Sequence, residues 1–243
     1  MSCGKGIAWF DLVPVVSWIA LRGRCRHCGV RISFQYPIVE FLTGVLFASI
    51  ALARAQDLLS APVHTLFILF IDCVIASLLI MIAIYDLRHT IIPDEWVYSF
   101  GALALVSAFF SVHTPAEVIV VLLSGPCVAA PLYAIWLFSG GRAMGLGDAK
   151  LALGIGWLLG SVSGIFAILG GFVLGAIISI PLLVFSSQWW RDIVARFTPR
   201  GTFLKSIGGF TMKSEVPFGP FLIASAVGYW VLSLYGVTLN IFS

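Results

Sequence analysis

The sequence predicts an all-α polytopic membrane protein. Of its 243 residues, 60% are hydrophobic and only 10% are charged, and the mean hydropathy is +1.06. Soluble domains carry about 25% charged residues, so an ordinary soluble domain is excluded. The apolar residues also gather in several runs close to the roughly 20 residues that a membrane-spanning helix needs. One buried core could not absorb so many runs.

The apolar runs predict about seven transmembrane helices. They cover residues 37–53, 63–85, 96–112, 116–138, 149–161, 164–186 and 217–239. No cleavable signal peptide is evident before them. We therefore expect a small N-terminal cysteine segment, residues 1–36, on one side of the membrane, followed by a transmembrane domain over residues 37–243. The run QWWRDIVARF at residues 188–197 predicts an interfacial helix that anchors the sixth span.

The distribution of basic residues predicts the orientation. With the N-terminus in the cytoplasm, 13 of the 14 Lys and Arg residues fall in cytoplasmic segments, and only Arg54 lies outside. The fifth run, residues 149–161, is short enough to be re-entrant. If it did not cross, the asymmetry would fall to 8 against 6, so we expect it to cross. Because topology explains the basic residues, they do not indicate nucleic-acid binding.

Two aspartates occupy the ends of apolar runs. Asp86 lies in YDLRHTIIPD and Asp148 lies in GLGDAK. Two predicted crossings separate them, so both return to the same, cytoplasmic, side of the membrane. A charged group at membrane depth is costly and by default indicates a functional site. We therefore expect the two carboxyl groups to form one site.

A pair of carboxyl groups suits acid and base chemistry. Two carboxylates about 3 Å apart cannot both ionise easily, so one keeps a proton while the other activates water. Gly145 and Gly147 leave room for a substrate or a partner helix beside Asp148, and Pro93 is expected to fix the turn into the third span. Asp148 is expected to open a helix and Asp86 to close one, so the helix dipoles favour charge on Asp148 and a proton on Asp86.

Structural roles for these acidic residues remain open. Glycine-rich turns between spans are common, and Asp often caps a helix. Asp72, inside the second span, is expected to hydrogen-bond a neighbouring helix. A proton relay would need a second acidic or basic residue in the middle of a span, and none is evident. The alternative function is a proton- or ion-coupled transporter that uses Asp72, Asp86 and Asp148. The absence of an inverted sequence repeat with paired broken helices counts against it.

The cysteines near the N-terminus form a second candidate site, for a metal ion. Cys25 and Cys28 make a CxxC turn in RGRCRHCG, and Cys3 lies upstream. A tight turn aims two thiolates at one tetrahedral ion, so the pattern is half of a zinc site, with Cys3 as a third ligand. His27 lies inside the turn and is poorly placed as the fourth. A reduced dithiol without metal is the competing interpretation.

Five sequence segments, in this order, give the chain a family resemblance. RGRCRHCG is followed by YPIVEFLTG, then by YDLRHTIIPD, GLGDAKL and, at residues 217–222, PFGPFL. Together they resemble the prepilin peptidases, or type IV leader peptidases, which are membrane aspartic proteases of the GxGD type. The resemblance runs over nearly the whole chain.

The resemblance implies that Asp86 and Asp148 are the catalytic pair. They would cleave the leader peptide of type IV prepilins or type II secretion pseudopilins, just after a glycine, at the cytoplasmic face of the bacterial inner membrane. The partners would be these substrates and the lipid bilayer, and proteolysis would need no cofactor. Many members also methylate the new N-terminus with S-adenosylmethionine. Five further residues are expected to support the site or bind substrate: Gly145, Gly147, Lys150, Pro93 and Asp94.

The chain departs from the family pattern near its start. Members typically begin with a spanning helix and carry two CxxC pairs, whereas only Cys3 of the first pair is present here, in MSCG. We interpret this as a late start or as a variant cysteine segment. The missing cysteines leave zinc binding and methyl transfer open. They also raise a third hypothesis, that the chain is a catalytically inactive assembly partner. Both aspartate motifs are intact.

Overall fold

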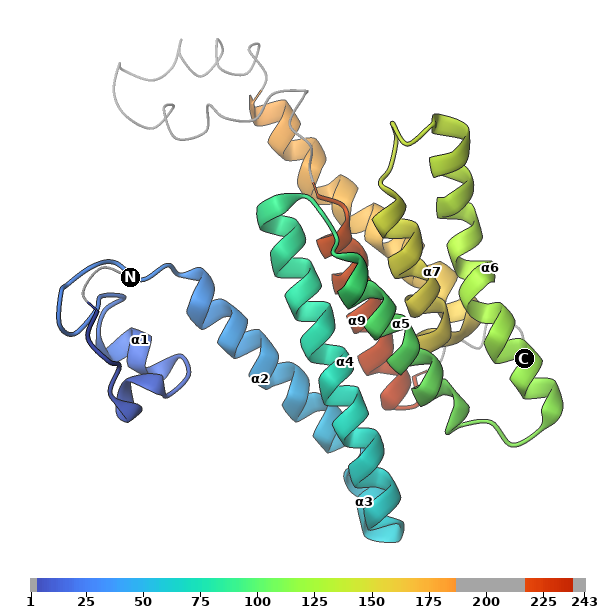
Figure 1. The fold of residues 1–243 in the computed structure, drawn as a ribbon, viewed down its shortest axis with the longest axis horizontal. Helices are drawn as coiled ribbons and strands as arrows, with labels where there is room; N and C mark the ends of the chain where they lie inside the picture. The colour runs from blue at the N-terminus through green and yellow to red at the C-terminus, as the bar shows by residue number, and fades with distance from the viewer. Residues whose placement is uncertain (1–3, 187–216, 238–243) are drawn as a thin grey trace. The chain divides into compact units, whose positions relative to one another are not determined.

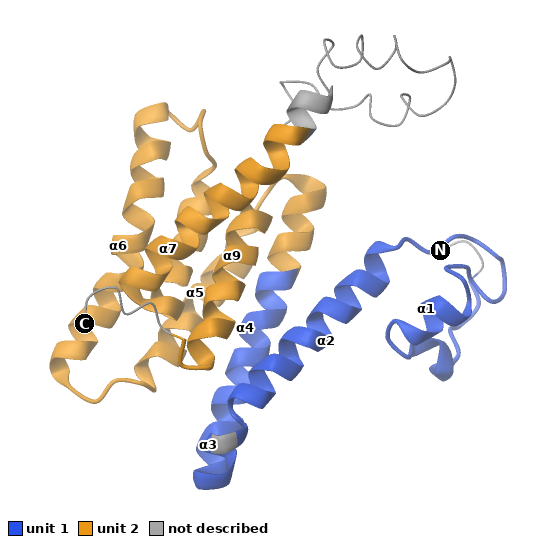
Figure 2. Ribbon diagram, turned by 180° about the vertical axis from the view of Figure 1, so that it is seen from behind, with its two compact units in different colours: residues 1–80 blue, residues 81–243 orange. Residues whose placement is uncertain are grey.

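A computed structural model describes residues 4–186 and 217–237 and confirms an all-α fold over them (Figure 1). The chain divides into two compact units, residues 1–80 and 81–243, with one long helix running through the boundary (Figure 2). Cys3 and the interfacial helix predicted at residues 188–197 lie outside the described residues.

Unit 1 holds the cysteine segment and two long apolar helices. A 3-10 helix η1 (Trp9–Leu12) and a short α1 (Val16–Ala20) precede α2 (Gln35–Ala53), which is followed by α3 (Ala55–Ser60) and by most of α4 (Pro62–His89). Both α2 and α4 are long and apolar enough to cross a membrane. They correspond to the first two predicted spans.

Unit 2 is built around α7 (Leu146–Ser186), which packs against α5 (Asp94–Phe109), α6 (Pro115–Ser139) and α9 (Gly219–Leu234). By length and composition α6 and α7 could also cross a membrane, whereas α9 is a shorter apolar helix. These helices correspond to the remaining predicted spans, and α5 begins two residues before its prediction.

The chain folds back in the middle of α7. Gly160 has φ 79° and ψ 175°, a non-helical conformation that is essentially restricted to glycine. A Cβ on Gly164 would lie only 3.4 Å from the Cα of Gly156, although eight residues of straight helix would separate the two by about 12 Å. The fifth and sixth predicted spans are therefore two helices, and the break lies at Gly160 rather than at residues 162–163.

Glycines let the helices of unit 2 approach closely. A Cβ on Gly156 would lie 2.6 Å from the backbone oxygen of Ser124 on α6, and one on Gly154 would overlap the Phe100 ring on α5. Membrane helices associate by this kind of close backbone packing, because lipid supplies no hydrophobic drive between them. The contacts hold the first turns of α7, where Asp148 lies, against α5 and α6.

A tryptophan compensates for a proline inside α6. Pro126 has no N–H, so the carbonyl of Leu122 lacks its usual helical donor. The indole Nε1–H of Trp157 on α7 donates to that carbonyl at 3.4 Å. A freed backbone group in a membrane needs such a partner, and the bond ties α6 to α7.

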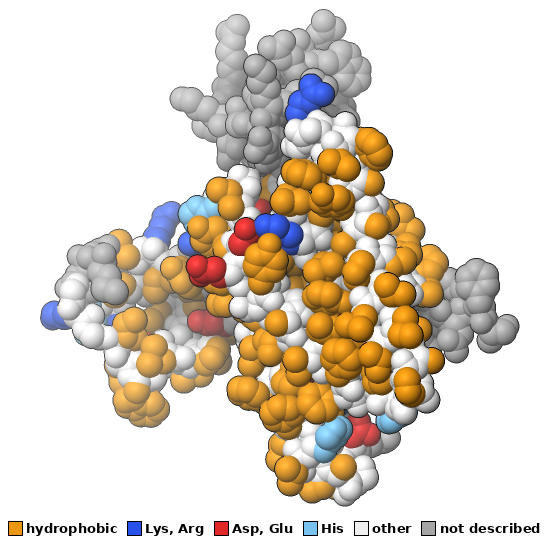
Figure 3. Space-filling view, turned by 45° about the vertical axis from the view of Figure 1, so that its right-hand side comes forward, with side chains coloured by type: hydrophobic (Ala, Val, Ile, Leu, Met, Phe, Trp, Pro, Cys, Tyr) orange, Lys and Arg blue, Asp and Glu red, His pale blue; other side chains and the backbone are white. Residues whose placement is uncertain are grey.

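The outer surface of the helices is largely apolar. Figure 3 shows hydrophobic side chains across the face of the molecule that it presents. On α6, Val120, Leu123 and Phe138 are 62%, 60% and 87% exposed. An apolar surface this extensive is expected of a protein that lies in lipid.

A buried ion pair links α2 to α4 within unit 1. Nη2 and Nε of Arg54 donate to Oδ2 of Asp72 at 3.0 and 3.2 Å. The Asp72 side chain is 1% exposed and that of Arg54 is 26% exposed. This gives Asp72 the inter-helix bond that the sequence predicts. It also neutralises the one basic residue predicted to lie outside the cytoplasm.

Candidate active site

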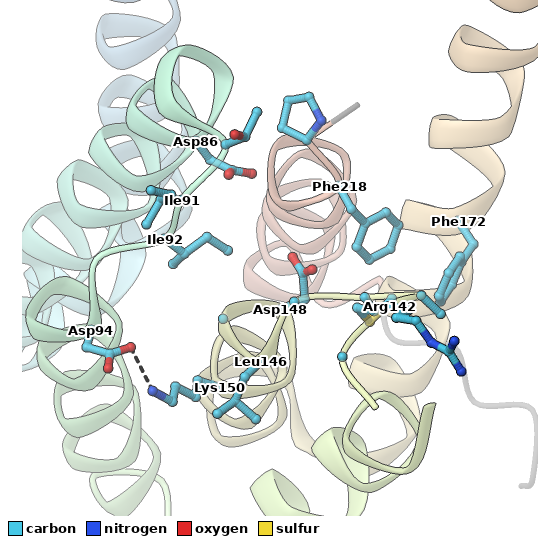
Figure 4. Close-up of a pocket in the computed structure, with 17 residues that line it drawn as sticks. Asp86, Ile91, Ile92, Asp94, Arg142, Leu146, Asp148, Lys150, Phe172 and Phe218 are labelled. Carbon is cyan, nitrogen blue, oxygen red and sulfur yellow. Dashed lines mark hydrogen bonds and ion pairs between the residues drawn. The ribbon is translucent and has the colours of Figure 1, made fainter. Parts of the chain in front are cut away.

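Asp86 and Asp148 line one cavity of about 690 Å³ in unit 2 (Figure 4). Asp86 lies in the last turn of α4, and Asp148 lies in the first turn of α7. The two residues are 4% and 8% exposed, and their carboxyl groups are close enough to interact electrostatically. The helices thus bring together two acids that lie far apart in the sequence.

Backbone donors hold both carboxyl groups. The N–H of Gly145 donates to Asp148, and the N–H of Gly219 donates to Asp86. Gly219 is the first residue of α9, so Asp86 faces the start of a second helix although it closes its own. The sequence prediction considered only the helix to which each aspartate belongs. In the structure, both aspartates lie beside the start of a helix, where the helix dipole favours a negative charge.

A short segment leads from Asp86 to α5. Thr90 donates its N–H to the carbonyl of Asp86 at 2.8 Å and has φ 52°, which is unusual for a β-branched residue. Pro93 has φ −66° and immediately precedes α5, at the turn where the sequence places it. Thr90 and Ile92 both line the cavity. The segment therefore forms part of the cavity wall.

An ion pair joins the two aspartate motifs. Nζ of Lys150 lies 2.7 Å from Oδ1 of Asp94, as the dashed line in Figure 4 marks. Nζ also lies 5.3 Å from the centre of the Tyr98 ring. The Asp94 side chain is 60% exposed, so the pair is worth little energy by itself. The predicted attraction of Asp94 for a basic leader remains a prediction, and one of its oxygens is already engaged.

The two glycines of the second motif differ in their surroundings. A Cβ on Gly145 would lie 3.7 Å from Oδ2 of Asp148, which is an ordinary contact. A Cβ on Gly147 would lie 3.0 Å from the Cβ of Ile92. The second glycine is thus required by close packing against the segment that follows Asp86.

The start of α9 forms a wall of the cavity that the sequence reasoning did not assign to the site. The rings of Phe218 and Phe172 are 4.6 Å apart, and both residues line the cavity with Pro217. Gly219 contacts Asp86 directly. The available signal was the motif PFGPFL, which places a glycine between an aromatic residue and a proline at the start of a span.

The arrangement suits hydrolysis by water. Two carboxyl groups meet in a cavity large enough for a segment of substrate and a water molecule. One carboxylate can accept a proton from water while the other, protonated, hydrogen-bonds a carbonyl oxygen.

The cysteine turn in unit 1 supplies two candidate metal ligands. The N–H of Cys25 donates to the carbonyl of Val30 at 2.8 Å, and the N–H of Gly29 donates to the carbonyl of Cys25 at 3.0 Å. This tight turn carries Cys28 as well. Within residues 4–186 and 217–237, no group of three or more His, Cys, Asp or Glu side chains could hold a metal ion. Two thiolates are half of a tetrahedral zinc site.

Unit 1 has a second cavity of about 690 Å³, lined by the cysteine segment and by the first turns of α2. Its wall carries two aromatic residues, Trp18 and Tyr36, and two acids, Asp11 and Glu40. Oε2 of Glu40 accepts the N–H of Val15 at 2.7 Å. Hydrogen bonds from Arg26, 2.7 to 3.1 Å long, lower the pKa of Asp11.

Two family models match the chain. The Bacterial Peptidase A24 N-terminal domain matches residues 1–54, and the Type IV leader peptidase family matches residues 73–180. The second match includes Asp86 and Asp148.

Several curated relatives carry the name prepilin leader peptidase/N-methyltransferase. The protein from Klebsiella pneumoniae is 32% identical over 163 residues, 65% of this chain and 67% of the relative. The protein from Xanthomonas campestris pv. campestris is 29% identical over 237 residues, 96% of this chain and 70% of the relative. The protein from Myxococcus xanthus is 33% identical over 187 residues, 75% of this chain and 52% of the relative. No solved structure matches the chain.

Proposed function

Since the chain belongs to the type IV leader peptidase family, we propose that it is an integral-membrane aspartic endopeptidase that removes the leader peptide of type IV prepilins or type II secretion pseudopilins. The single observation that carries the proposal is the meeting of Asp86 and Asp148 in one cavity. Each aspartate lies in one of the two aspartate motifs that contribute to the resemblance.

The two aspartates act as general base and general acid in peptide hydrolysis. One carboxylate takes a proton from water, and the water oxygen bonds to the carbonyl carbon of the scissile peptide. The other carboxyl group donates a hydrogen bond to the carbonyl oxygen as charge develops there. The C–N bond then breaks, and the new amine takes up a proton. The backbone N–H groups of Gly145 and Gly219 keep the carboxyl groups oriented during these steps.

The proposed location is the inner membrane of a bacterium, with the N-terminus and the cavity on the cytoplasmic side. The positive-inside distribution supports this orientation. A prepilin presents a basic leader in the cytoplasm ahead of an apolar helix, so its scissile bond lies at the interface. The two aspartates lie at helix ends, where water reaches them without a cavity in mid-membrane.

Membrane vesicles test activity and orientation together. We expect inverted vesicles, which expose the cytoplasmic face, to cleave an added purified prepilin, and sealed right-side-out vesicles to leave it intact. Mass spectrometry of the product locates the cut. Cleavage by right-side-out vesicles alone would reverse the proposed orientation, and no cleavage by either preparation would contradict the peptidase.

The competing functions have less support. The comparisons give no support to a proton- or ion-coupled transporter, and Asp72 is paired with Arg54 and does not line the cavity that holds Asp86 and Asp148. An inactive assembly partner would have no need of two acids held by backbone donors in one cavity. Complementation of a peptidase-deficient strain separates this hypothesis from an active enzyme.

Methyl transfer is a second proposed activity, because the relatives' names include it. S-adenosylmethionine supplies a methyl group to an amine when it is bound. The cavity of unit 1 fits its chemistry: Trp18 and Tyr36 offer aromatic faces to adenine or the sulfonium, while Glu40 offers a carboxylate to its cations or ribose. Arg31 in the same wall matches its carboxylate.

Direct binding tests this assignment without any turnover. We expect Glu40→Gln to weaken S-adenosylmethionine binding about tenfold, because a hydrogen bond to a charged group is worth about 1.5 kcal/mol. Calorimetry on the detergent-solubilised Asp148→Asn chain gives the affinity. Glu117→Gln, in unit 2, is the matched control and should bind normally. Unchanged affinity in both Glu40→Gln and Tyr36→Ala would rule out the cavity.

Zinc binding remains a prediction based on Cys25, Cys28 and Cys3. The turn around Cys25 has the tight geometry that a zinc half-site needs. Two thiolates alone do not complete a tetrahedral site, so no step of either proposed reaction depends on the metal. Metal analysis of the purified chain checks the prediction, and a chain without zinc would contradict it.

A further inference from the structure

The side chain of Ile92 lies where three motifs meet. A Cβ on Gly147, in the second aspartate motif, would lie 3.0 Å from the Cβ of Ile92. A Cβ on Gly219, at the start of α9, would lie 3.2 Å from its Cδ1. Ile92 itself follows Asp86 by six residues. One apolar side chain thus spaces the segment after Asp86 from both the start of α7 and the start of α9.

Gly219 is also in direct contact with Asp86. A Cβ at this position would lie 2.5 Å from Oδ2 and 3.3 Å from the carboxyl carbon of Asp86. Real Cβ atoms essentially never approach another heavy atom so closely, so the carboxyl group would have to move. The N–H of the same residue donates to that carboxyl group.

The sign of φ does not explain the glycine. Gly219 is not among the residues with positive φ, unlike Gly160 or Gly140. Pro220 follows directly, and a residue with a Cβ is disfavoured in the helical region before proline, so the proline gives one reason for a glycine. The space that the Asp86 carboxyl group occupies gives a second reason, which only the Asp86→Ala background can remove.

We propose that Gly219 is a positioning residue for proteolysis, with Ile92 as the spacer that fixes its distance from the two aspartate motifs. The glycine gives Asp86 room to lie against the start of α9, and its N–H fixes which way the carboxyl group faces. The proposal rests on the proposed peptidase function and adds the PFGPFL motif to the active site. Gly219 acts through Asp86 and does not itself touch the reacting atoms.

A purely structural role is the competing explanation. Glycines elsewhere serve the packing of α7 on α9: a Cβ on Gly171 would lie 3.0 Å from the Cα of Leu222. If Gly219 served only the same packing, its replacement would lower stability and leave the properties of the dyad unchanged in the folded fraction. The two explanations therefore differ in what happens to catalysis per folded molecule.

Gly219→Ala tests the proposal in the full-length chain in detergent. We expect kcat for prepilin cleavage to fall about 100-fold with little change in KM, since misplacing a reacting group by about 1 Å costs that much. The pH profile of kcat should also shift, because the methyl group would displace the Asp86 carboxyl group from the backbone N–H at position 219 and change its orientation. Gly228→Ala is the matched control on the same helix, with open space around its Cβ. It should cleave at the wild-type rate.

A double variant covers the case in which Gly219→Ala folds poorly. If the methyl group clashes with the Asp86 carboxyl group, any drop in the midpoint of thermal unfolding should be smaller in an Asp86→Ala background, where that group is absent. An equal drop in both backgrounds would contradict the proposal. Wild-type kcat and an unchanged pH profile in Gly219→Ala would also overturn it.

These outcomes are separate from a failure of the proposed function. If the wild-type chain did not cleave any prepilin, the peptidase itself would be wrong. The unfolding comparison would still report whether Gly219 and Asp86 are coupled, because it needs no turnover.

Discussion

Asp86→Asn and Asp148→Asn each reduce cleavage of a purified prepilin by about 10⁴-fold or more, the size of loss seen when a member of a catalytic set is removed. An amide keeps the shape of the side chain but can neither accept a proton from water nor share one with its partner. Both side chains are buried in the same cavity, and Asp94, the other acid among the described residues that line it, is paired with Lys150. Initial rates of cleavage, followed by mass spectrometry, measure the effect.

Asp57→Asn is the matched control for these two variants. Asp57 is an exposed aspartate on α3, in unit 1, and is not among the residues that line the cavity of unit 2. It should cleave at the wild-type rate. If either Asp86→Asn or Asp148→Asn also cleaved normally, the two acids would not be the catalytic pair. Thermal unfolding of each variant separates lost catalysis from lost folding.

Arg54→Leu is expected to cost about 3 to 5 kcal/mol of stability, because it leaves the Asp72 carboxylate buried without its partner. In the part of the chain that the structure describes, Oδ1 of Asp72 already lacks a hydrogen-bond partner. The bonds from Arg54 to Oδ2 are therefore the hydrogen bonds that stabilise the buried carboxylate. The midpoint of thermal unfolding in detergent measures the loss.

The double variant Arg54→Leu/Asp72→Leu should recover most of that stability. Replacing both members of a buried ion pair by apolar residues is often neutral or stabilising, whereas removing one member is not. If the double variant were as unstable as Arg54→Leu, the loss of stability would come from the lost packing of Arg54 and not from the unpaired, buried Asp72 carboxylate. Prepilin cleavage by the folded double variant should be unchanged.

The sequence was sufficient for the architecture and for the two aspartates. Spanning helices need long apolar runs, so the all-α fold and the order of its apolar helices follow from hydropathy. Asp86 and Asp148 stand out because charge is rare at the ends of such runs. Crossing parity alone then places them on one side of the membrane, and the structure has both in one cavity.

The contacts that complete the site could not be predicted in the same way. That Lys150 pairs with Asp94, or that Gly219 gives its N–H to Asp86, depends on how helices far apart in sequence turn toward one another. The sequence also assigned a proton to Asp86 from its own helix alone. The start of α9, which lies beside it, belongs to a motif that begins 131 residues after Asp86.

The conformation of Gly160 has a consequence for how the chain is threaded through the bilayer. An uninterrupted helix over the 41 residues of α7 would be about 60 Å long, twice the thickness of the hydrocarbon core. In the predicted topology the folded-back pair crosses twice, whereas an uninterrupted helix would cross once, so every later segment would be predicted on the opposite side. Gly219 would then be separated from Asp86 by the whole membrane. In that topology, one backbone torsion decides on which side of the membrane the last helix begins.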